Sequence, residues 1–224
     1  MIKCISERHI SSASKEQKSE RGSPKFELIA GALCLDFLNT LDDRYSDHPN
    51  ELLRTYEDLA RFAEETGILT TAQVHSLIAK SHQHPEQAKD ALAQAIRLRE
   101  AAYAVFWARL KKKLVPQKDL SVLNEYIQKG AQHIILEPGN RRFEWRFDSS
   151  SSGFDAVLWP IARSAADLLA SDQLEFVRAC ASKTCEWLFL DESKNHRRRW
   201  CDMTKCGNRA KVRSFYTRQK KNAS

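Results

Sequence analysis

The sequence predicts a mainly α-helical fold with a small antiparallel β element and a separate cysteine-rich module at the C-terminal end. Apolar residues recur every three or four positions over most of residues 56–130 and again over 154–170, which is the period of a helix with one buried face. Residues 133–147 instead alternate between apolar and polar side chains, which is the period of a strand. Four of the six cysteines fall within residues 180–206.

The chain divides into three parts. Residues 1–24 are rich in Ser, Lys and Glu, and we expect them to form a flexible tail. Residues 25–173 are expected to form a mainly helical domain, and residues 174–224 the cysteine module. Thr70 suits a helix N-cap and Pro85 the first turn of a helix. Within the helical domain we expect a short strand at 25–30, a hairpin from 133–137 and 142–147, and helices at 33–41, 56–66, 71–82, 85–113, 116–130 and 154–170.

The composition is that of a globular protein that dissolves in water. Hydrophobic residues make up 42% and charged residues 29% of the 224-residue chain, so collagen, coiled-coil and fully disordered classes are excluded. The sequence has no run of eighteen apolar residues, and its first twenty residues lack the apolar core of a secretory signal. We therefore expect a cytoplasmic protein with no membrane partner.

The net charge of +7 is concentrated at the C-terminal end of the chain. Residues 180–224 hold 12 Lys and Arg against 4 Asp and Glu, whereas residues 1–179 hold 24 against 25. A near-neutral body with a basic end indicates a separate task for that end. A solvated basic tail that only aids solubility is the alternative, and the cysteines within the same segment argue against it.

The cysteine spacing indicates a tetrahedral metal site. Cys180 and Cys185 form one C-x4-C pair, and Cys201 and Cys206 form a second pair after a spacer of fifteen residues. Each pair supplies two sulfur ligands from one tight turn, and the spacer brings the two turns together. We expect these four residues to bind one structural Zn²⁺ in a zinc-ribbon or treble-clef-like finger, because no open coordination position is evident.

Disulfides, an iron–sulfur cluster and unrelated free thiols are the alternatives for the four cysteines. Reducing compartments disfavour disulfides. Iron–sulfur clusters also use four cysteines, but the aromatic and basic spacer suits zinc better. Of the other two cysteines, Cys34 lies in an apolar run and is interpreted as a small buried side chain, while Cys4 lies in the predicted tail.

Between the two cysteine pairs we expect two short strands joined by a turn at 191–194. Arg197, Arg198 and Arg199 would then form a basic cluster at the foot of the second strand. Aromatic residues flank the cysteines, and a small zinc module needs such bulky groups to complete its core. Base stacking is the alternative role for these residues, which are Trp187, Phe189 and Trp200.

The stretch after the last cysteine predicts a basic helix over residues 208–221. Val212, Phe215 and Tyr216 share one face by their spacing, and we expect this face to pack on the zinc site. Residues 194–224 hold eleven basic groups and one acidic group, and nucleic acid is the natural polyanion for such a surface. A solvated helix without a partner and an acidic protein partner are the alternatives. The residues expected to contact nucleic acid are Arg197, Arg198, Arg199, Arg209, Lys211, Arg213, Arg218 and Lys220. Among them, Arg209 or Arg213 is expected to reach bases.

Several short motifs in the cysteine module are shared with a known family. One is the run Cys201-Asp-Met-x-x-Cys206-Gly207-Asn208-Arg209-Ala-Lys211. Upstream of it stand Cys185-x-Trp187-x-Phe189-x-Asp191-x-Ser193 and Arg198-Arg199-Trp200-Cys201. Together these motifs resemble the CGNR zinc finger.

The helical domain carries a second likeness. The run Leu35-Asp36-Phe37-Leu38-Asn39-Thr40 is similar to the signature of the ABATE domain, which accompanies this finger. The segments Leu98-Arg99-Glu100 and Pro160-Ile161-Ala162 are similar to that family as well. The combined resemblance covers residues 25–220 and implies a bacterial, stress-induced transcription regulator whose finger contacts nucleic acid. It also implies that the zinc ligands are Cys180, Cys185, Cys201 and Cys206. Fingers of this kind have been suggested to bind RNA too.

Asp36 and Asn39 are polar residues three positions apart on a predicted apolar helix. A buried polar pair needs hydrogen-bond partners, and we interpret the pair as a lock on a neighbouring loop. The alternative is that both residues line a small-molecule effector pocket in a sensing domain. No base, nucleophile or metal ligand follows at catalytic spacing, so we do not expect an enzyme.

These observations favour a zinc-finger, DNA-binding transcription regulator with an N-terminal sensing or dimerisation domain. We expect DNA rather than RNA as the partner. Two other classes stay open: an RNA-binding or ribosome-associated factor with the same basic surface, and a protein or small-molecule interaction module whose zinc is only structural. Regulators are often homodimers, but no heptad repeat or exposed apolar stripe in the sequence indicates one.

Overall fold

The computed structural model of the chain describes residues 26–148 and 153–222, without the side chains of residues 218 and 220–222. The tail predicted at residues 1–24 lies outside the described residues. Within them the fold is mostly helical with small antiparallel hairpins, as the sequence predicts. None of the described helices combines the length and the apolar character needed to cross a bilayer.

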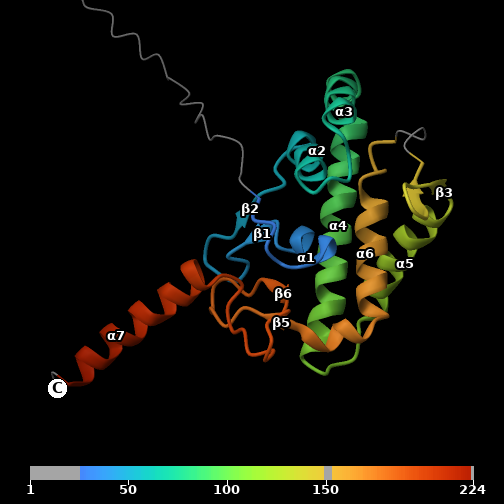
Figure 1. Cartoon of the computed structure of the whole chain (residues 1–224). Helices are drawn as coiled ribbons and strands as arrows, with labels where there is room; N and C mark the ends of the chain where they lie inside the picture. Colours follow the sequence, from blue (N-terminus) through green and yellow to red (C-terminus); the bar gives the residue numbers. More distant parts are fainter. Residues whose placement is uncertain (1–25, 149–152, 223–224) are drawn as a thin grey trace, which may run out of the picture.

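The elements follow one another along the chain as labelled in Figure 1. The helices are α1 (Leu33–Leu38), α2 (Tyr56–Glu65), α3 (Thr71–Gln83), α4 (Pro85–Leu110), α5 (Gln117–Ala131), α6 (Leu158–Leu169) and α7 (Asn208–Asn222). The strands are β1 (Leu41–Asp42), β2 (Asn50–Glu51), β3 (Ile134–Pro138), β4 (Phe143–Phe147), β5 (Val177–Ala179) and β6 (Leu188–Leu190). A 3₁₀ turn, η1 (Asp172–Phe176), and a π-helical turn, η2 (Met203–Gly207), complete the described elements.

The long helix α4 is the spine of the molecule (Figure 1). Its 26 residues span about 39 Å at 1.5 Å per residue. Helices α5 and α6 pack along it, and the short helix α1 sits against both α4 and α6. The apolar side chains of α1 are fully buried, including Leu35 and Phe37 at 0% exposure. The segment with the Leu35–Thr40 motif therefore occupies the centre of the core.

Local signals set the helix boundaries where they were predicted. Thr70 accepts a hydrogen bond from the backbone N–H of Gln73, and the Gln73 side chain accepts one from the backbone N–H of Thr70. Thr55 and Asp58 form the same reciprocal cap at the start of α2. These caps satisfy backbone donors that have no partner within the helix. Pro85 stands in the first turn of α4, as expected.

The strand predicted at residues 25–30 is wrong. Residues 26–30 run without strand structure, although the Ala30 carbonyl accepts a hydrogen bond from Leu190 N–H at 2.8 Å. The Ala30 N–H is taken by the Asp36 carboxylate at 2.9 Å, so it cannot continue a ladder. Gly31 then turns the chain at φ +82°, and a Cβ there would lie 3.1 Å from the Leu190 Cβ.

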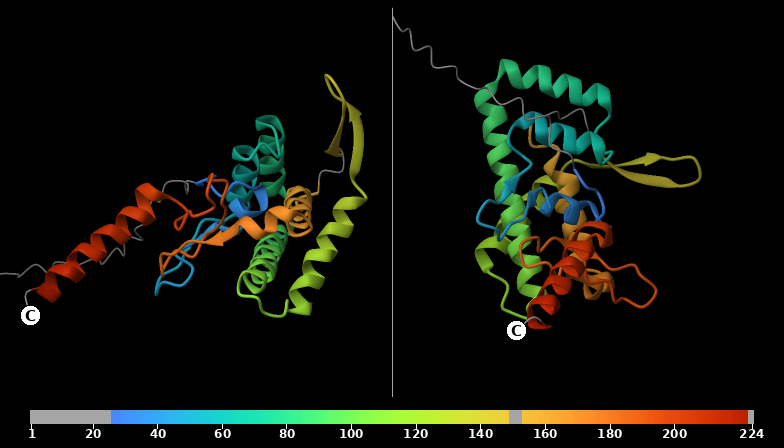
Figure 2. Two further views of the ribbon diagram at one scale, coloured as in Figure 1. Left: turned by 60° about the horizontal axis from the view of Figure 1, so that its bottom comes forward. Right: turned by 90° about the vertical axis from the view of Figure 1, so that its left-hand side faces the viewer.

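The predicted hairpin at 133–147 is confirmed as β3 and β4. The strands pair in antiparallel register, with Leu136 opposite Trp145 and Pro138 opposite Phe143. Figure 2 shows that this hairpin projects from the helical body. Apolar side chains toward its tip are therefore open to solvent, with Trp145 at 72% and Phe143 at 63% exposure, while Ile134 and Phe147 at its base are half-buried.

The cysteine module shares one hydrophobic core with the helical domain. Val177, Leu188 and Phe189 of β5 and β6 are fully buried in the same cluster as the apolar residues of α1, α4 and α6. The Tyr103 hydroxyl of α4 donates to the Glu186 carbonyl at 3.4 Å, and Lys205 forms an ion pair with Glu27. The two parts are thus packed as one structure.

Inside the module one of the two predicted strands is confirmed: β6 lies directly before the turn expected at 191–194, but its partner strand lies elsewhere than predicted. β5 precedes Cys180 and pairs with β6 after Cys185, so the first cysteine pair forms the turn of this hairpin. Residues 191–200 contain no strand. His196 in that stretch adopts φ +47°, a left-handed conformation that a strand does not accept.

Candidate metal centre and nucleic-acid interface

The four paired cysteines converge on one buried point. Cys180, Cys185, Cys201 and Cys206 are 2–3% exposed, and their Sγ atoms all lie within 4.8 Å of one another. Neighbouring sulfurs are 3.6 Å apart for Cys185 and Cys201 and 3.7 Å apart for Cys201 and Cys206. A tetrahedral zinc ion with Zn–S bonds of about 2.3 Å places its sulfurs about 3.8 Å apart. The donor set and its spacing therefore fit Zn²⁺.

Backbone hydrogen bonds shape the first cysteine turn. Cys180 N–H donates to the Trp187 carbonyl at 2.8 Å, which closes the hairpin around the turn. Ala181 N–H donates to the Arg199 carbonyl at 2.8 Å and ties the turn to the segment before Cys201. Glu186 adopts φ +48°, so the chain reverses directly after Cys185. Both thiols of the pair consequently point to the same side.

The second cysteine turn explains why Gly207 and Asn208 follow Cys206. A Cβ at Gly207 would lie 2.5 Å from the Met203 Sδ, so no larger residue fits without displacing that side chain. The Asn208 amide donates to the Thr204 carbonyl at 2.9 Å. Asp202 accepts hydrogen bonds from the Thr204 backbone at 2.6 Å and from its hydroxyl at 2.7 Å. Cys206 thereby sits at the N-terminus of α7, where the helix dipole favours a negative thiolate.

Asp191 organises the loop between the two cysteine pairs. Its side chain is completely buried and accepts hydrogen bonds from Ser193 N–H and Oγ and from Arg198 N–H. Burial alone would raise the pKa of Asp191, but these hydrogen bonds outweigh it and hold the pKa below its ordinary value. The loop is therefore fixed by an ionised carboxylate.

Arg198 and Arg209, two of the residues predicted to contact nucleic acid, also make contacts within this chain. Arg198 Nε donates to the Trp200 carbonyl at 2.9 Å, and its guanidinium lies 4.5 Å from the centre of the Phe189 ring. Arg209 Nη2 lies 3.4 Å from the Cys206 sulfur and Nη1 lies 4.0 Å from Asp43. A zinc ion with four thiolates carries a net charge of about −2, which Arg209 offsets in part.

The other predicted contact residues face solvent or belong to α7. Arg197 and Arg199 are exposed, with the Arg199 guanidinium 5.0 Å from the centre of the Trp200 ring. Lys211 and Arg213 are exposed on α7. Arg218 and Lys220 also belong to α7, but their side chains lie outside the described part of the structure.

The predicted packing of α7 on the zinc site is wrong. Val212 is 54%, Phe215 55% and Tyr216 63% exposed. Figures 1 and 2 show α7 leaving the finger and pointing away from the body. The spacing of these residues predicted one apolar face correctly, but the zinc site is already enclosed by Trp187, Phe189 and the residues around them. We call residues 208–222 the α7 arm.

Asp36 and Asn39 both find hydrogen-bond partners within the chain. The Asn39 amide donates to the Leu188 carbonyl at 2.9 Å and accepts from Leu188 N–H at 3.0 Å, at 3% exposure. Asp36 accepts from Ala30 N–H, and burial raises its pKa to about 6. Both side chains thus lock neighbouring segments. An effector pocket at these residues stays a prediction.

Two hollows in the described part of the chain lie elsewhere. One of about 870 Å³ lies where α4 and α6 end against residues 171–178. Another of about 150 Å³ lies beside the zinc site, between Trp187 and the acidic residues Glu27 and Asp42. Neither is lined by Asp36 or Asn39.

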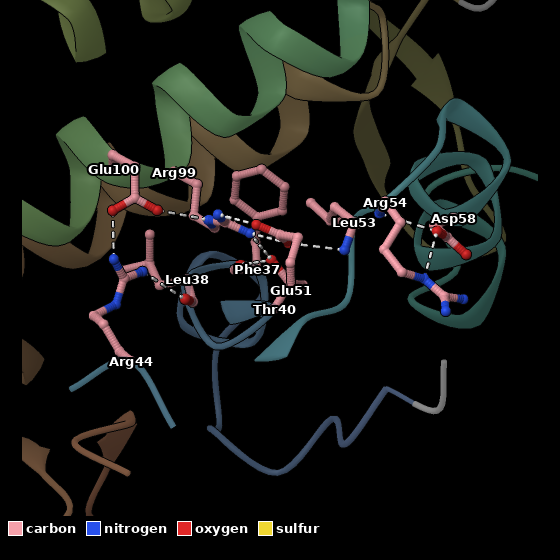
Figure 3. Close-up of polar contacts among 10 residues, drawn as sticks. All are labelled: Phe37, Leu38, Thr40, Arg44, Glu51, Leu53, Arg54, Asp58, Arg99 and Glu100. Carbon is pink, nitrogen blue, oxygen red and sulfur yellow. Dashed lines mark hydrogen bonds and ion pairs between the residues drawn. The ribbon is translucent and has the colours of Figure 1, made fainter. Parts of the chain in front are cut away.

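A buried ion-pair network behind α1 was not predicted (Figure 3). Arg99 of α4 is 2% exposed and binds both Glu51 carboxylate oxygens, at 2.7 and 2.6 Å. It also donates to Glu100 at 2.9 Å and to the Thr40 hydroxyl at 3.1 Å. Figure 3 shows that these groups come from α4, from the turn after α1 and from β2. The network therefore holds the β1–β2 hairpin, which flanks the finger, against the spine.

Arg44 extends this network toward the finger. It forms an ion pair with Glu100, and its guanidinium lies 3.9 Å from the centre of the Tyr103 ring. Tyr103 in turn donates to the Glu186 carbonyl between the zinc ligands and β6. The sequence signal for Arg99 is its position four residues after Ala95 and three before Ala102, on the buried face of α4. An arginine on such a face requires acidic partners.

Two family models match the chain over most of its length. Residues 31–172 match the ABATE family, described as “Putative stress-induced transcription regulator”. The chain belongs to this family. Residues 177–219 match the CGNR zinc finger, so the C-terminal cysteines form a zinc finger whose metal is zinc. A search of curated proteins finds no relative.

The Leu35–Thr40 motif now has a structural meaning within this family. Its apolar residues fill the centre of the core, and its Asn39 carries the two hydrogen bonds to β6 of the CGNR finger. The resemblance noted in the sequence is confirmed for both parts. Neither family description names a reaction.

Proposed function

We propose that this ABATE-family protein is a zinc-dependent DNA-binding transcription regulator that works in the cytoplasm. One observation carries the proposal: the α7 arm points away from the body, exposes Arg209, Lys211 and Arg213 to solvent, and contains no acidic residue. Unpaired cations on a projecting helix attract a polyanion, and a duplex carries one negative charge about every 1.7 Å of its axis. Zinc contributes by fixing the turn from which the arm starts.

The basic residues divide into two groups by their contacts. Arg198 and Arg209 also hold the loop and the zinc-ligand turn, so each makes a contact within the chain besides its proposed role in binding. Within the described residues no carboxylate pairs with Arg197, Lys211 or Arg213. These three, with Arg199, Arg218 and Lys220, are the proposed phosphate contacts. DNA rather than RNA is the proposed partner, because the width of a helix matches the major groove of B-form DNA.

The helical domain would supply regulation in this proposal. It holds the finger through Asn39, Tyr103 and Glu27, so any change in its packing reaches the zinc turns directly. Sensing of a small-molecule effector and formation of a homodimer are the two proposed tasks of this domain.

Salt-dependent binding to a duplex tests the proposal. Zinc-loaded full-length protein should bind a 30-base-pair random duplex at low salt, with the logarithm of affinity falling linearly with the logarithm of salt concentration. The double variant Lys211→Ala, Arg213→Ala should bind about tenfold more weakly and show a shallower salt slope.

The matched control removes the same charge from the body. Lys89 and Lys118 are exposed on α4 and α5, so Lys89→Ala, Lys118→Ala should bind the duplex like wild type. An equal loss of duplex affinity in both double variants would mean that the effect comes from net charge alone. No binding to duplex DNA at low salt would overturn the proposal, and binding to single-stranded RNA alone would favour the ribosome-associated alternative.

A further inference from the structure

The α7 arm exposes an apolar stripe as well as charge. Val212, Phe215 and Tyr216 lie at i, i+3 and i+4 on one side of the helix and are each more than half exposed. The arm spans about 22 Å over its 15 residues. The described residues of the body do not cover the stripe: after the first turn, where Arg209 reaches Asp43, the arm runs free of the domain.

Basic residues border this apolar stripe on both sides. With 100° between successive helical residues, Arg209 and Arg213 fall on one border and Lys211 falls on the other. A second copy of the arm is a poor occupant, because two helices with several cations and no acidic residue repel each other. The charge pattern instead fits a groove that has negative charges along both sides and apolar groups at its base.

We propose that the α7 arm lies in the major groove of duplex DNA, with its apolar stripe against the base edges and its two basic borders on the opposite phosphate backbones. This inference rests on the proposed nucleic-acid function and adds the groove, the orientation and the residues that read sequence. Val212, Phe215 and Tyr216 contact base edges, where thymine presents a methyl group. Lys211 and Arg213 contact phosphates and carry no sequence information.

The dimensions select duplex DNA among nucleic acids. A helix with side chains is about 10–12 Å across, and the major groove of B-form DNA is about 12 Å wide. The corresponding groove of an RNA duplex is too narrow and deep for side chains to read. Proteins that bind unpaired strands use a basic groove that follows the backbone, whereas the α7 arm is a convex rod.

The test separates base reading from charge. Zinc-loaded full-length protein is used to select from a random 30-base-pair duplex pool, and the enriched sequence is compared with the pool. The double variant Val212→Ala, Phe215→Ala should keep pool binding within about twofold and its salt slope unchanged, but lose at least about tenfold of the preference for the enriched sequence. Replacing thymine by uracil in the enriched duplex should weaken wild type more than this variant.

Control variants fix the interpretation. Thr217→Ala changes the opposite side of the arm and should retain the preference in full. Lys211→Ala, Arg213→Ala should weaken binding to every sequence alike. Zinc content of one ion per chain verifies that each variant has a folded finger.

Three results would overturn the groove assignment while leaving nucleic-acid binding intact. They are an unchanged preference in the apolar variant, equal affinity for single-stranded DNA of the same sequence, and no enrichment despite salt-dependent duplex binding. Binding to vesicles of anionic phospholipid that survives high salt and is lost in Val212→Ala, Phe215→Ala would assign the stripe to a membrane surface. Absence of any duplex or single-strand binding at low salt would remove the proposed function itself.

Discussion

Arg99 in the core and Arg213 on the α7 arm occupy opposite environments in one chain. Arg99 is 2% exposed, with every side of its guanidinium matched by Glu51, Glu100 or the Thr40 hydroxyl. Arg213 is exposed, and no carboxylate among the described residues pairs with it. A buried cation without partners is costly, so the body supplies its own anions. The arm leaves its cations for an anion that the protein does not contain, and this difference separates residues that hold the fold from residues that meet a partner.

The largest effect is expected from loss of the zinc ion, because the α7 arm starts from the finger that this ion folds. Cys201→Ser should lower the zinc content from one ion per chain and unfold the finger, because structural zinc contributes about 10 kcal/mol or more to folding at neutral pH. Metal analysis and circular dichroism measure both. Cys34 is a buried cysteine outside the site whose pKa burial raises to about 12, so Cys34→Ala should retain one zinc.

The buried side of the comparison is tested at Arg99. Arg99→Ala leaves Glu51 without its cation and Glu100 with Arg44 alone. It should lower the free energy of unfolding by about 3 kcal/mol, toward the lower end for broken buried pairs because Glu51 and Glu100 are partly exposed. Urea unfolding gives the value. Arg97, two residues earlier, is about half exposed and pairs with Glu125, so Arg97→Ala should cost less than about 1 kcal/mol. Similar losses of unfolding free energy in Arg99→Ala and Arg97→Ala would mean that the buried arginine contributes no more to stability than the exposed one.

The attachment of the finger is tested at Asn39. Asn39→Ala leaves the buried N–H and carbonyl of Leu188 without partners and should cost about 2 kcal/mol. Hydrogen exchange at the Leu188 amide should accelerate in step with this loss. Asn39→Asp keeps an acceptor for Leu188 N–H but removes the donor, so it should protect that amide better than Ala does. Unchanged exchange in Asn39→Ala would mean that the finger is held by packing alone.

The smallest effect is a pH dependence from Asp36. Burial raises its pKa to about 6 in the folded state, above the value of about 3.9 expected for an unfolded Asp. The protonated carboxyl is therefore favoured by folding, and this stability is present at low pH and lost as pH rises toward 6. Between pH 5 and pH 7 the group should remove about 1 kcal/mol of stability. Asp36→Asn should flatten the dependence of the unfolding free energy on pH in this range. The same pH dependence in the variant and in wild type would mean that another group causes it.

Local patterns predicted most of the fold, because helix caps and apolar periods act within a few residues. The starts of α3 and α4 follow from Thr70 and Pro85 in this way, and the start of α2 follows from its apolar period. The strand expected at 25–30 was wrong because the Asp36 side chain takes the Ala30 N–H, and the Ala30 carbonyl bonds to the distant Leu190. The partner of β6 was not predicted either, because local patterns do not show that β5 pairs with it across the first cysteine turn.

The zinc ligands were predictable because their spacing alone encodes two converging turns. The Arg99 network was not, since its main partner, Glu51, lies 48 residues away in the sequence. The contacts of Arg198 and Arg209 within the chain were not predicted either, because sequence gives their charge but not their neighbours. The spacing of Val212, Phe215 and Tyr216 reveals an apolar face and carries no information on what covers it, so its exposure required the structure.

The shared core of the two matched families bears on how such proteins evolve. Leu188 and Phe189 of the finger are buried in the core that β6 shares with α1, and Asn39 completes the hydrogen bonds of the Leu188 backbone. A gene fusion that moved residues 177–219 to another host would carry the metal ligands but leave an apolar surface bare. The two parts should therefore be inherited together, and substitutions in α1 should be answered by substitutions in β6.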